Sequence, residues 1–333
     1  MRSKCGSSSV GRASASQAEG RGFEPRLPLK IHCSNTGMKS LAPHINVEDS
    51  RLINGLRALV AIVCGVEDAR EEEIELDFSN TRFISPVFAV SLLVYLSKTQ
   101  NKIRLKNYSP YMQVVYMHEP LMPDKMRASM FSAVLQGYKG KTYVPVVSFP
   151  AIAESDQKDV ILSAVEDVII SQLCITSNIA QGLKYVISET IDNITEHSQS
   201  ERGYIFAQAY PTKGFLDICI ADTGITLLGS YKAAGIVDYE SDIEAIQAAN
   251  RRISAKNLPN AENRGFGIYT TKQMLINGLG GQYMILSGEA LYMKGPAFDE
   301  FLALPSGVRF EGTIVALRIP YQNKLFNYLN YID

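Results

Sequence analysis

The chain has 333 residues, enough for two folded domains, and 46% of them are apolar, as in ordinary globular proteins. Its 33 basic and 34 acidic residues leave a net charge of −1, so no general electrostatic attraction to nucleic acid or membrane surfaces is expected. The five cysteines form no CxxC pair, and the apolar runs are short and interrupted. We therefore expect a reduced, cytoplasmic protein with no transmembrane helix, no structural metal, and neither nucleic acid nor membrane as a partner.

Residues 1–37 differ in composition from the rest of the chain. They are rich in Ser, Gly and Arg and lack apolar periodicity, so we predict that they are disordered. The apolar segment of a secretory signal is missing, and Glu19 and Glu24 weigh against a transit peptide. The stretch Arg21-Gly-Phe-Glu-Pro-Arg26 looks like the conceptual translation of a transfer-RNA gene. This interpretation makes the extension a gene-calling artefact and places the natural start at Met38.

Residues 38–138 combine helical and strand patterns, which predicts an α/β domain. Apolar residues at helical spacing indicate a helix over 50–64, and alternating residues indicate strands over 73–78 and 102–106. Between the strands, Ser85 and Pro86 begin an apolar helix, with Ser as the N-cap and Pro at the first helical position.

The strand, turn and helix start over 76–86 resemble the STAS domain of anti-sigma-factor antagonists, and the resemblance extends over roughly 45–125. The regulatory phosphoserine of that family would align with Pro86 or Val87, neither of which can be phosphorylated. A capping role is therefore favoured for Ser85. The resemblance implies a docking or sensing element rather than a phosphorylation switch.

Residues 139–158 contain Gly, Pro and polar clusters and are predicted to link this domain to a second one over 159–333. The second domain would begin with a helix over 159–173. Asn178 is then expected to cap a longer helix.

The segment from Glu189 to His197 in this longer helix carries the strongest functional signal. Glu189, Asn193 and His197 follow at four-residue steps and form one slowly rotating polar stripe. The apolar stripe beside it, expected to face a core, consists of Leu183, Ile187, Ile191 and Ile194. A polar stripe that borders a core-facing stripe indicates the floor of a pocket. The alternative, a solvated helix face with an incidental Asn and His, has equal weight on this segment alone.

Three later motifs place glycines beside polar residues at the ends of predicted elements. They are Asp222-Thr-Gly224 after a strand over 215–221, Asn263-Arg-Gly-Phe-Gly267 before a helix over 268–276, and Gly312-Thr313 before the last strand. Together with the Glu/Asn/His helix, and in this order, they resemble the boxes of the GHKL ATPase superfamily, which includes gyrases, heat-shock chaperones, histidine kinases and mismatch-repair ATPases. The resemblance covers roughly 160–320 and is closest to anti-sigma-factor-type ATP-binding proteins. It implies a two-layer Bergerat-type α/β sandwich with a mixed sheet and helices on one face.

The resemblance also implies ATP and Mg²⁺ as ligands. Asn193 would be the protein's Mg²⁺ ligand, and its amide oxygen suits a hard cation. Glu189 would be the general base that polarises a water or an acceptor hydroxyl, or, in a phosphotransfer reaction, a supporting carboxylate beside the site. His197 would contact phosphate or, equally, serve packing and charge complementarity at the end of its helix.

The base of the nucleotide would bind near the end of the predicted strand over 215–221. In the family the residue equivalent to Asp222 accepts a hydrogen bond from the adenine amino group, and Gly224 would let the backbone approach the base. Thr226 stands where a second glycine is usual, which leaves the local loop path open. Thr313 is a further cofactor-binding candidate.

The phosphates would bind near the glycine-rich motif. Gly265 and Gly267 would expose backbone amides at a helix N-terminus, which favours anions. Arg264 would reach the γ-phosphate and stabilise the charge of phosphoryl transfer. Lys272, further into the helix, is expected to be solvated.

The long segment over 225–262 matches the position of the family's ATP lid, and we expect it to be mobile. Two functions remain open. The first is an enzyme that hydrolyses ATP or transfers phosphate to a protein serine, and the second is an ATP-gated interaction switch without useful turnover. Both imply a regulatory protein partner, and a homodimer is a further expectation.

Overall fold

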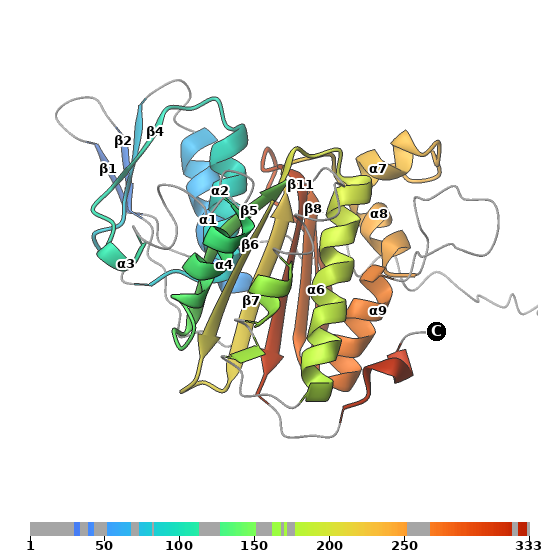
Figure 1. Cartoon of the computed structure of the whole chain (residues 1–333). Helices are drawn as coiled ribbons and strands as arrows, with labels where there is room; N and C mark the ends of the chain where they lie inside the picture. Colours follow the sequence, from blue (N-terminus) through green and yellow to red (C-terminus); the bar gives the residue numbers. More distant parts are fainter. Residues whose placement is uncertain are drawn as a thin grey trace, which may run out of the picture.

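The computed structural model describes residues 30–33, 39–42, 52–67, 73–81, 83–112, 127–150, 162–167, 170–171, 177–251, 267–321 and 326–331. Within them the chain forms a small sheet, a layer of two helices, a large sheet and a second helix layer (Figure 1). The predicted α/β class is confirmed. Among the described helices, none has the length and apolar character needed to span a bilayer.

The N-terminal unit, residues 30–112, contains the four-stranded sheet. Its elements are β1 (Lys30–Cys33), β2 (Lys39–Ala42), α1 (Ile53–Glu67), β3 (Ile74–Asp77), α2 (Pro86–Lys98), β4 (Ile103–Lys106) and α3 (Pro110–Met112). The strand order is β1-β2-β3-β4, with β1 antiparallel to β2 and the other pairs parallel. The prediction of disorder throughout 1–37 is therefore wrong for residues 30–33, because they pair with residues 39–42.

The C-terminal unit, residues 127–331, contains the seven-stranded sheet. Its helices are α4 (Ala128–Gln136), α6 (Ser177–His197), α7 (Leu227–Ala233), α8 (Asp242–Ala249) and α9 (Gly267–Gln273), continued by the π-helix η3 (Met274–Gly278), and the 3-10 helix η4 (Tyr328–Tyr331). Its strands are β5 (Tyr143–Pro150), β6 (Arg202–Tyr210), β7 (Phe215–Asp222), β8 (Gln282–Gly288), β9 (Ala290–Gly295), β10 (Phe298–Ala303) and β11 (Phe310–Pro320). Residues 162–167 and 170–171 are also helical, within the predicted helix over 159–173.

The large sheet has the order β10-β9-β8-β11-β7-β6-β5, and every neighbouring pair is antiparallel. The expected mixed sheet is therefore wrong. Strands joined by short turns, such as β6 to β7 and β8 to β9, can only pair antiparallel, whereas a parallel pair needs a long crossover.

Helices cover both faces of the large sheet, which corrects the expected two-layer arrangement. Alternation along β7 directs Ile218 and Ile220 toward the core shared with α4, α6 and η3. Cys219 and Ala221 point to the opposite face and belong to a core shared with α1 and α2. Because β7 is apolar on both faces, each face needs a covering layer.

The expected linker over 139–158 contains β5, which pairs with β6 at the edge of the large sheet. Phe131 and Leu135 of α4 pack into the same core as Val147 and Phe149 of β5, so the C-terminal unit begins before the predicted boundary. Pro145 and Pro150 suggested a linker because proline rarely occurs in strands. Here Pro145 lies at a register shift between Val144 and Val147, and β5 is an edge strand, where proline is tolerated.

Candidate functional site

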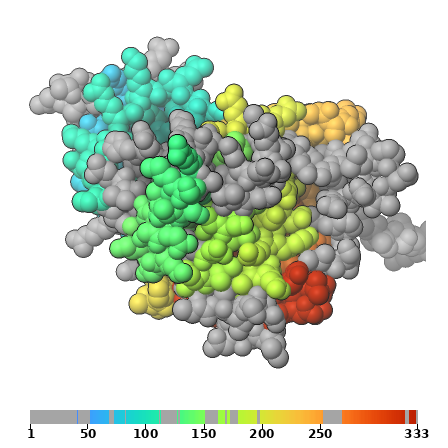
Figure 2. Space-filling model, viewed as in Figure 1, coloured from blue at the N-terminus to red at the C-terminus, as the bar shows by residue number. Residues whose placement is uncertain are grey.

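The site is built on one face of α6, at the end of the large sheet where β7 ends. The apolar stripe of α6 is buried as predicted, and its side chains are at most 5% exposed: Leu183, Ile187, Ile191 and Ile194. Glu189 and Asn193 are half-buried along the border of this stripe. Figures 1 and 2 show α6 covering the sheet beside α9, with its outer side at the molecular surface. The side chain of His197 lies outside the described residues.

Asp222 forms the centre of the sheet side of the site. Its carboxylate is 1% exposed, and it accepts hydrogen bonds from two backbone amides. The amide of Gly224 donates to Oδ1 at 2.8 Å, and the amide of Thr313 donates to Oδ2 at 3.2 Å. Two motifs that lie 91 residues apart in the chain therefore meet at one carboxylate.

The electrostatics of Asp222 follow from its burial. Burial raises the pKa of its carboxyl to about 7, although the amide hydrogen bonds of Gly224 and Thr313 and the charge of Lys98 act in the opposite direction. A carboxylate has more acceptor sites than the two that these amides occupy, so it can accept a further hydrogen bond from a ligand's amino group.

Gly224 lies where the turn after β7 contacts the end of α6. A methyl group at this position would overlap the carbonyl oxygen of Ser198. The amide of Ile225 donates to the same oxygen at 2.7 Å, and the hydroxyls of Ser200 and Thr223 lie 3.0 Å apart. The turn that holds Asp222 is thus fixed to the C-terminal end of α6, where the expected functional stripe ends.

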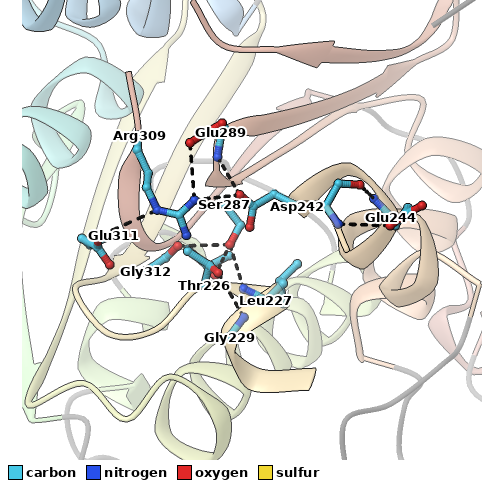
Figure 3. Close-up of polar contacts among 12 residues, drawn as sticks. Thr226, Leu227, Gly229, Asp242, Glu244, Ser287, Glu289, Arg309, Glu311 and Gly312 are labelled. Carbon is cyan, nitrogen blue, oxygen red and sulfur yellow. Dashed lines mark hydrogen bonds and ion pairs between the residues drawn. The ribbon is translucent and has the colours of Figure 1, made fainter. Parts of the chain in front are cut away.

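Ser287 on β8 joins this region to α7 and was not identified from the sequence (Figure 3). Its hydroxyl donates to the carbonyl of Gly312 at 3.1 Å, lies 3.2 Å from the hydroxyl of Thr313 and accepts from the amide of Leu227 at 2.9 Å. Thr226 caps α7, because its hydroxyl accepts from the amide of Gly229 at 3.1 Å. The chain after Gly224, whose path could not be predicted because Thr226 replaces the usual glycine, therefore enters α7 directly. A lone serine in a strand gives no sequence signal for such a role.

The described part of the expected lid consists of α7 and α8, which are packed against the body of the molecule. Ile246 of α8 is fully buried in the core under the sheet. Asp242 of α8 accepts from the amide of Glu289 and from Arg309, both at 3.0 Å (Figure 3). Residues 225–251 are thus anchored at both helices, and 252–262 lie outside the described residues.

The phosphate side of the site is described only in part. Arg264 and Gly265 lie outside the described residues, and the described part of α9 starts at Gly267, one residue before the predicted start. Lys272 is 6% exposed rather than solvated, and its ammonium donates to the side-chain oxygen of Asn250 at 2.8 Å. Burial lowers its pKa to about 8. Lys272 therefore joins the end of α8 to α9.

The structure brings Asp222, Gly224 and Thr313 into direct contact. By the alternation along β7, Asp222 faces the helix layer that carries Glu189 and Asn193. Comparison of the chain with protein-family models, with curated proteins and with solved structures gave no match. The functional assignment rests on the residues and their geometry.

Proposed function

We propose that this protein is a Mg-ATP-binding regulator of the histidine-kinase-like (GHKL) ATPase type. The observation that carries the proposal is the contact of Asp222 with Gly224 and Thr313, on the sheet face covered by α6. Asp222 and Gly224 belong to one motif of the resemblance and Thr313 to another. A buried carboxylate that backbone amides hold in place can accept a further hydrogen bond from the amino group of the base. The pairing of β7 with β11 brings the two motifs together.

In this proposal each region binds one part of the nucleotide. Asp222 accepts the adenine amino group, while the glycine-rich motif with Gly265, Gly267 and Arg264 binds the phosphates. Among the described residues, no three His, Cys, Asp or Glu side chains form a metal site. Asn193 is the proposed protein ligand of Mg²⁺, because its amide oxygen suits a hard cation whose other ligands are phosphate oxygens and water. Bound Mg²⁺ would neutralise phosphate charge and orient the phosphates.

Glu189 favours an enzyme, either an ATPase or a serine/threonine protein kinase of the anti-sigma-factor type. A half-buried carboxylate one helical turn before the Mg²⁺ ligand is suited to polarise a water or a serine hydroxyl. The N-terminal unit supplies no phosphoacceptor at Ser85, which caps α2 and whose hydroxyl a methyl group at Gly55 would overlap. The capping role of Ser85 favours an acceptor serine on a separate protein. The capping role of Ser85 is also compatible with the alternative function, an ATP-gated switch that binds a partner protein.

Calorimetric titration of the full chain with ATP, with and without Mg²⁺, tests the proposal. We expect Mg²⁺-dependent binding that Asn193→Ala weakens about tenfold or more, because the ion loses its protein ligand. Gln181→Ala is the matched control, since Gln181 is an exposed amide on the same helix, and it should bind as the wild type does. The proposal fails if the wild type does not bind ATP, or if the two variants behave alike.

Phosphate release and transfer of the γ-phosphate to candidate partner proteins separate the enzyme from the switch. Turnover that is lost in Glu189→Ala while ATP affinity is retained supports the enzyme. If the wild type and Glu189→Ala both bind ATP but neither turns it over, the result supports the switch.

A further inference from the structure

A pocket lies where the N-terminal unit meets the large sheet. Its volume is about 720 Å³, within the range of small-molecule sites. Its walls come from the C-terminal half of α2, the turn that leads to β4, the end of α1 and the first residues of β11. The proposed nucleotide site lies nearby, because Arg309 to Glu311 line the pocket and Gly312 and Thr313 follow directly at the Asp222 contact.

The acidic residues of this pocket already have partners. Glu67 accepts from the hydroxyl of Tyr95 at 3.4 Å, and Glu73 pairs with Arg104 at 3.1 Å. Glu311 lies 3.9 Å from Nε of Arg309, which also binds Asp242 and Glu289. Glu73 and Glu311 thus lie beside cations, whereas Glu67 is bonded only to a neutral hydroxyl and keeps its charge.

The lysines of the pocket differ from the carboxylates. Among the residues that the structure describes, no acidic side chain lies within ion-pair distance of Lys98 or Lys102. Both are exposed and come from the same end of α2 and its following turn. Beside them the pocket has a buried floor of Val94, Tyr95 and Phe310, which are at most 8% exposed. The pocket thus combines two unpaired cations with an apolar base.

We propose that this pocket binds a small molecule with several closely spaced anionic oxygens, of phosphate or carboxylate type, and that Lys98 and Lys102 bind these oxygens. Ammonium groups bind such oxygens through charge-assisted hydrogen bonds. The apolar floor accommodates the carbon skeleton of the molecule. The pocket residues are distinct from those of the proposed nucleotide site, although the charge of Lys98 also acts on Asp222.

Calorimetric titration of the full chain with citrate and with inorganic pyrophosphate, at low ionic strength, tests this proposal. We expect saturable binding of at least one probe, and the probe that binds identifies the carboxylate or the phosphate type. Lys98→Glu with Lys102→Glu should weaken binding at least about tenfold, because two cations become anions. The control pair Lys139→Glu with Lys141→Glu makes the same charge change at exposed lysines outside the pocket and should leave binding unchanged. If the variant with Lys98→Glu and Lys102→Glu does not fold, the variant with Lys98→Gln and Lys102→Gln takes its place.

Three results would overturn the proposal. The first is that neither probe binds the wild type. The second is that the control pair weakens binding as strongly as the pocket pair. The third is that the variant Asp222→Asn loses probe binding. The last result would place the probe in the nucleotide site. A variant that loses ATP binding but retains probe binding separates the two sites, so each proposal can fail alone.

Discussion

At the residue scale, Asp222 is held in place before any ligand arrives. Its two carboxylate oxygens accept backbone amides from the turn after β7 and from β11, so its orientation is set by the sheet itself. Lys272 is a second buried ionisable group, and its hydrogen bond to Asn250 connects two helices. The sequence indicated Asp222 as a candidate because Asp222-Thr-Gly224, in its place after the Glu/Asn/His helix, resembles a GHKL motif. It did not predict the burial of Lys272, since a single lysine in a helix usually faces solvent.

The raised pKa of Asp222 predicts a pH-dependent stability. Its folded pKa is about 7 and its ordinary value is 3.8, so between these values the folded state binds more protons than the unfolded state. Its contribution to the free energy of unfolding is therefore greatest at low pH and is lost as pH rises through about 7. Asp222→Asn cannot titrate, so the stability of the wild type relative to this variant should fall by on the order of 2–3 kcal/mol between about pH 5 and pH 8. Urea unfolding of both proteins measures this difference, and a constant difference would contradict the assigned pKa.

At the element scale, the start of β11 determines how the motif Asp222-Thr-Gly224 meets the motif Gly312-Thr313. The register with β8 shifts between Phe310 and Thr313, and Gly312 has a φ of 77° within this shift. A methyl group at Gly312 would overlap the carbonyl oxygen of Asp222. Local sequence predicts a strand here, but the register shift depends on the neighbouring strands. The position of β5 at the edge of the sheet also depends on its neighbours, and its prolines had indicated a linker rather than a strand.

Two glycines in the same backbone conformation allow a matched test of this contact. Gly307 also has a positive φ, of 82°, and a methyl group there would meet nothing within 4 Å. Gly307→Ala should cost only the strain of the left-handed conformation, about 1–2 kcal/mol. Gly312→Ala should cost more, about 3 kcal/mol or above, because it adds a clash with Asp222, and it should weaken ATP binding as well. Thermal unfolding and calorimetry compare the variants, and equal costs would show that the close approach has no energetic importance.

At the scale of the whole molecule, α2 joins the two units. Its residues are buried on all sides from Pro86 to Leu92, as expected of a helix enclosed between layers. One core cluster includes Phe88 of α2 and Phe206 and Met284 of the large sheet. The STAS-like resemblance suggested a separate domain, whereas the shared core makes the N-terminal unit a covering layer of the large sheet.

The shared core predicts that the two units unfold together. Phe88→Ala removes a fully buried aromatic side chain and should destabilise the protein by about 3–5 kcal/mol. Hydrogen exchange in low urea should then increase in β6 and β7 as well as in α1 and β3. Leu329→Ala, at a side chain that is 60% exposed, should leave exchange unchanged. If the large sheet retains its protection while the N-terminal unit exchanges, the two units are independent.

Short-range patterns are sufficient to predict several features, including the cap of α2 and the buried stripe of α6. Such signals depend on residues within one or two turns of each other, so they can be recognised without knowledge of the fold. The contact of Asp222 with Thr313, the link from Ser287 to α7 and the position of α2 on the second face of the sheet become evident only in the folded protein. These contacts depend on strand order and register, which are set by the packing of the whole core rather than by neighbouring residues.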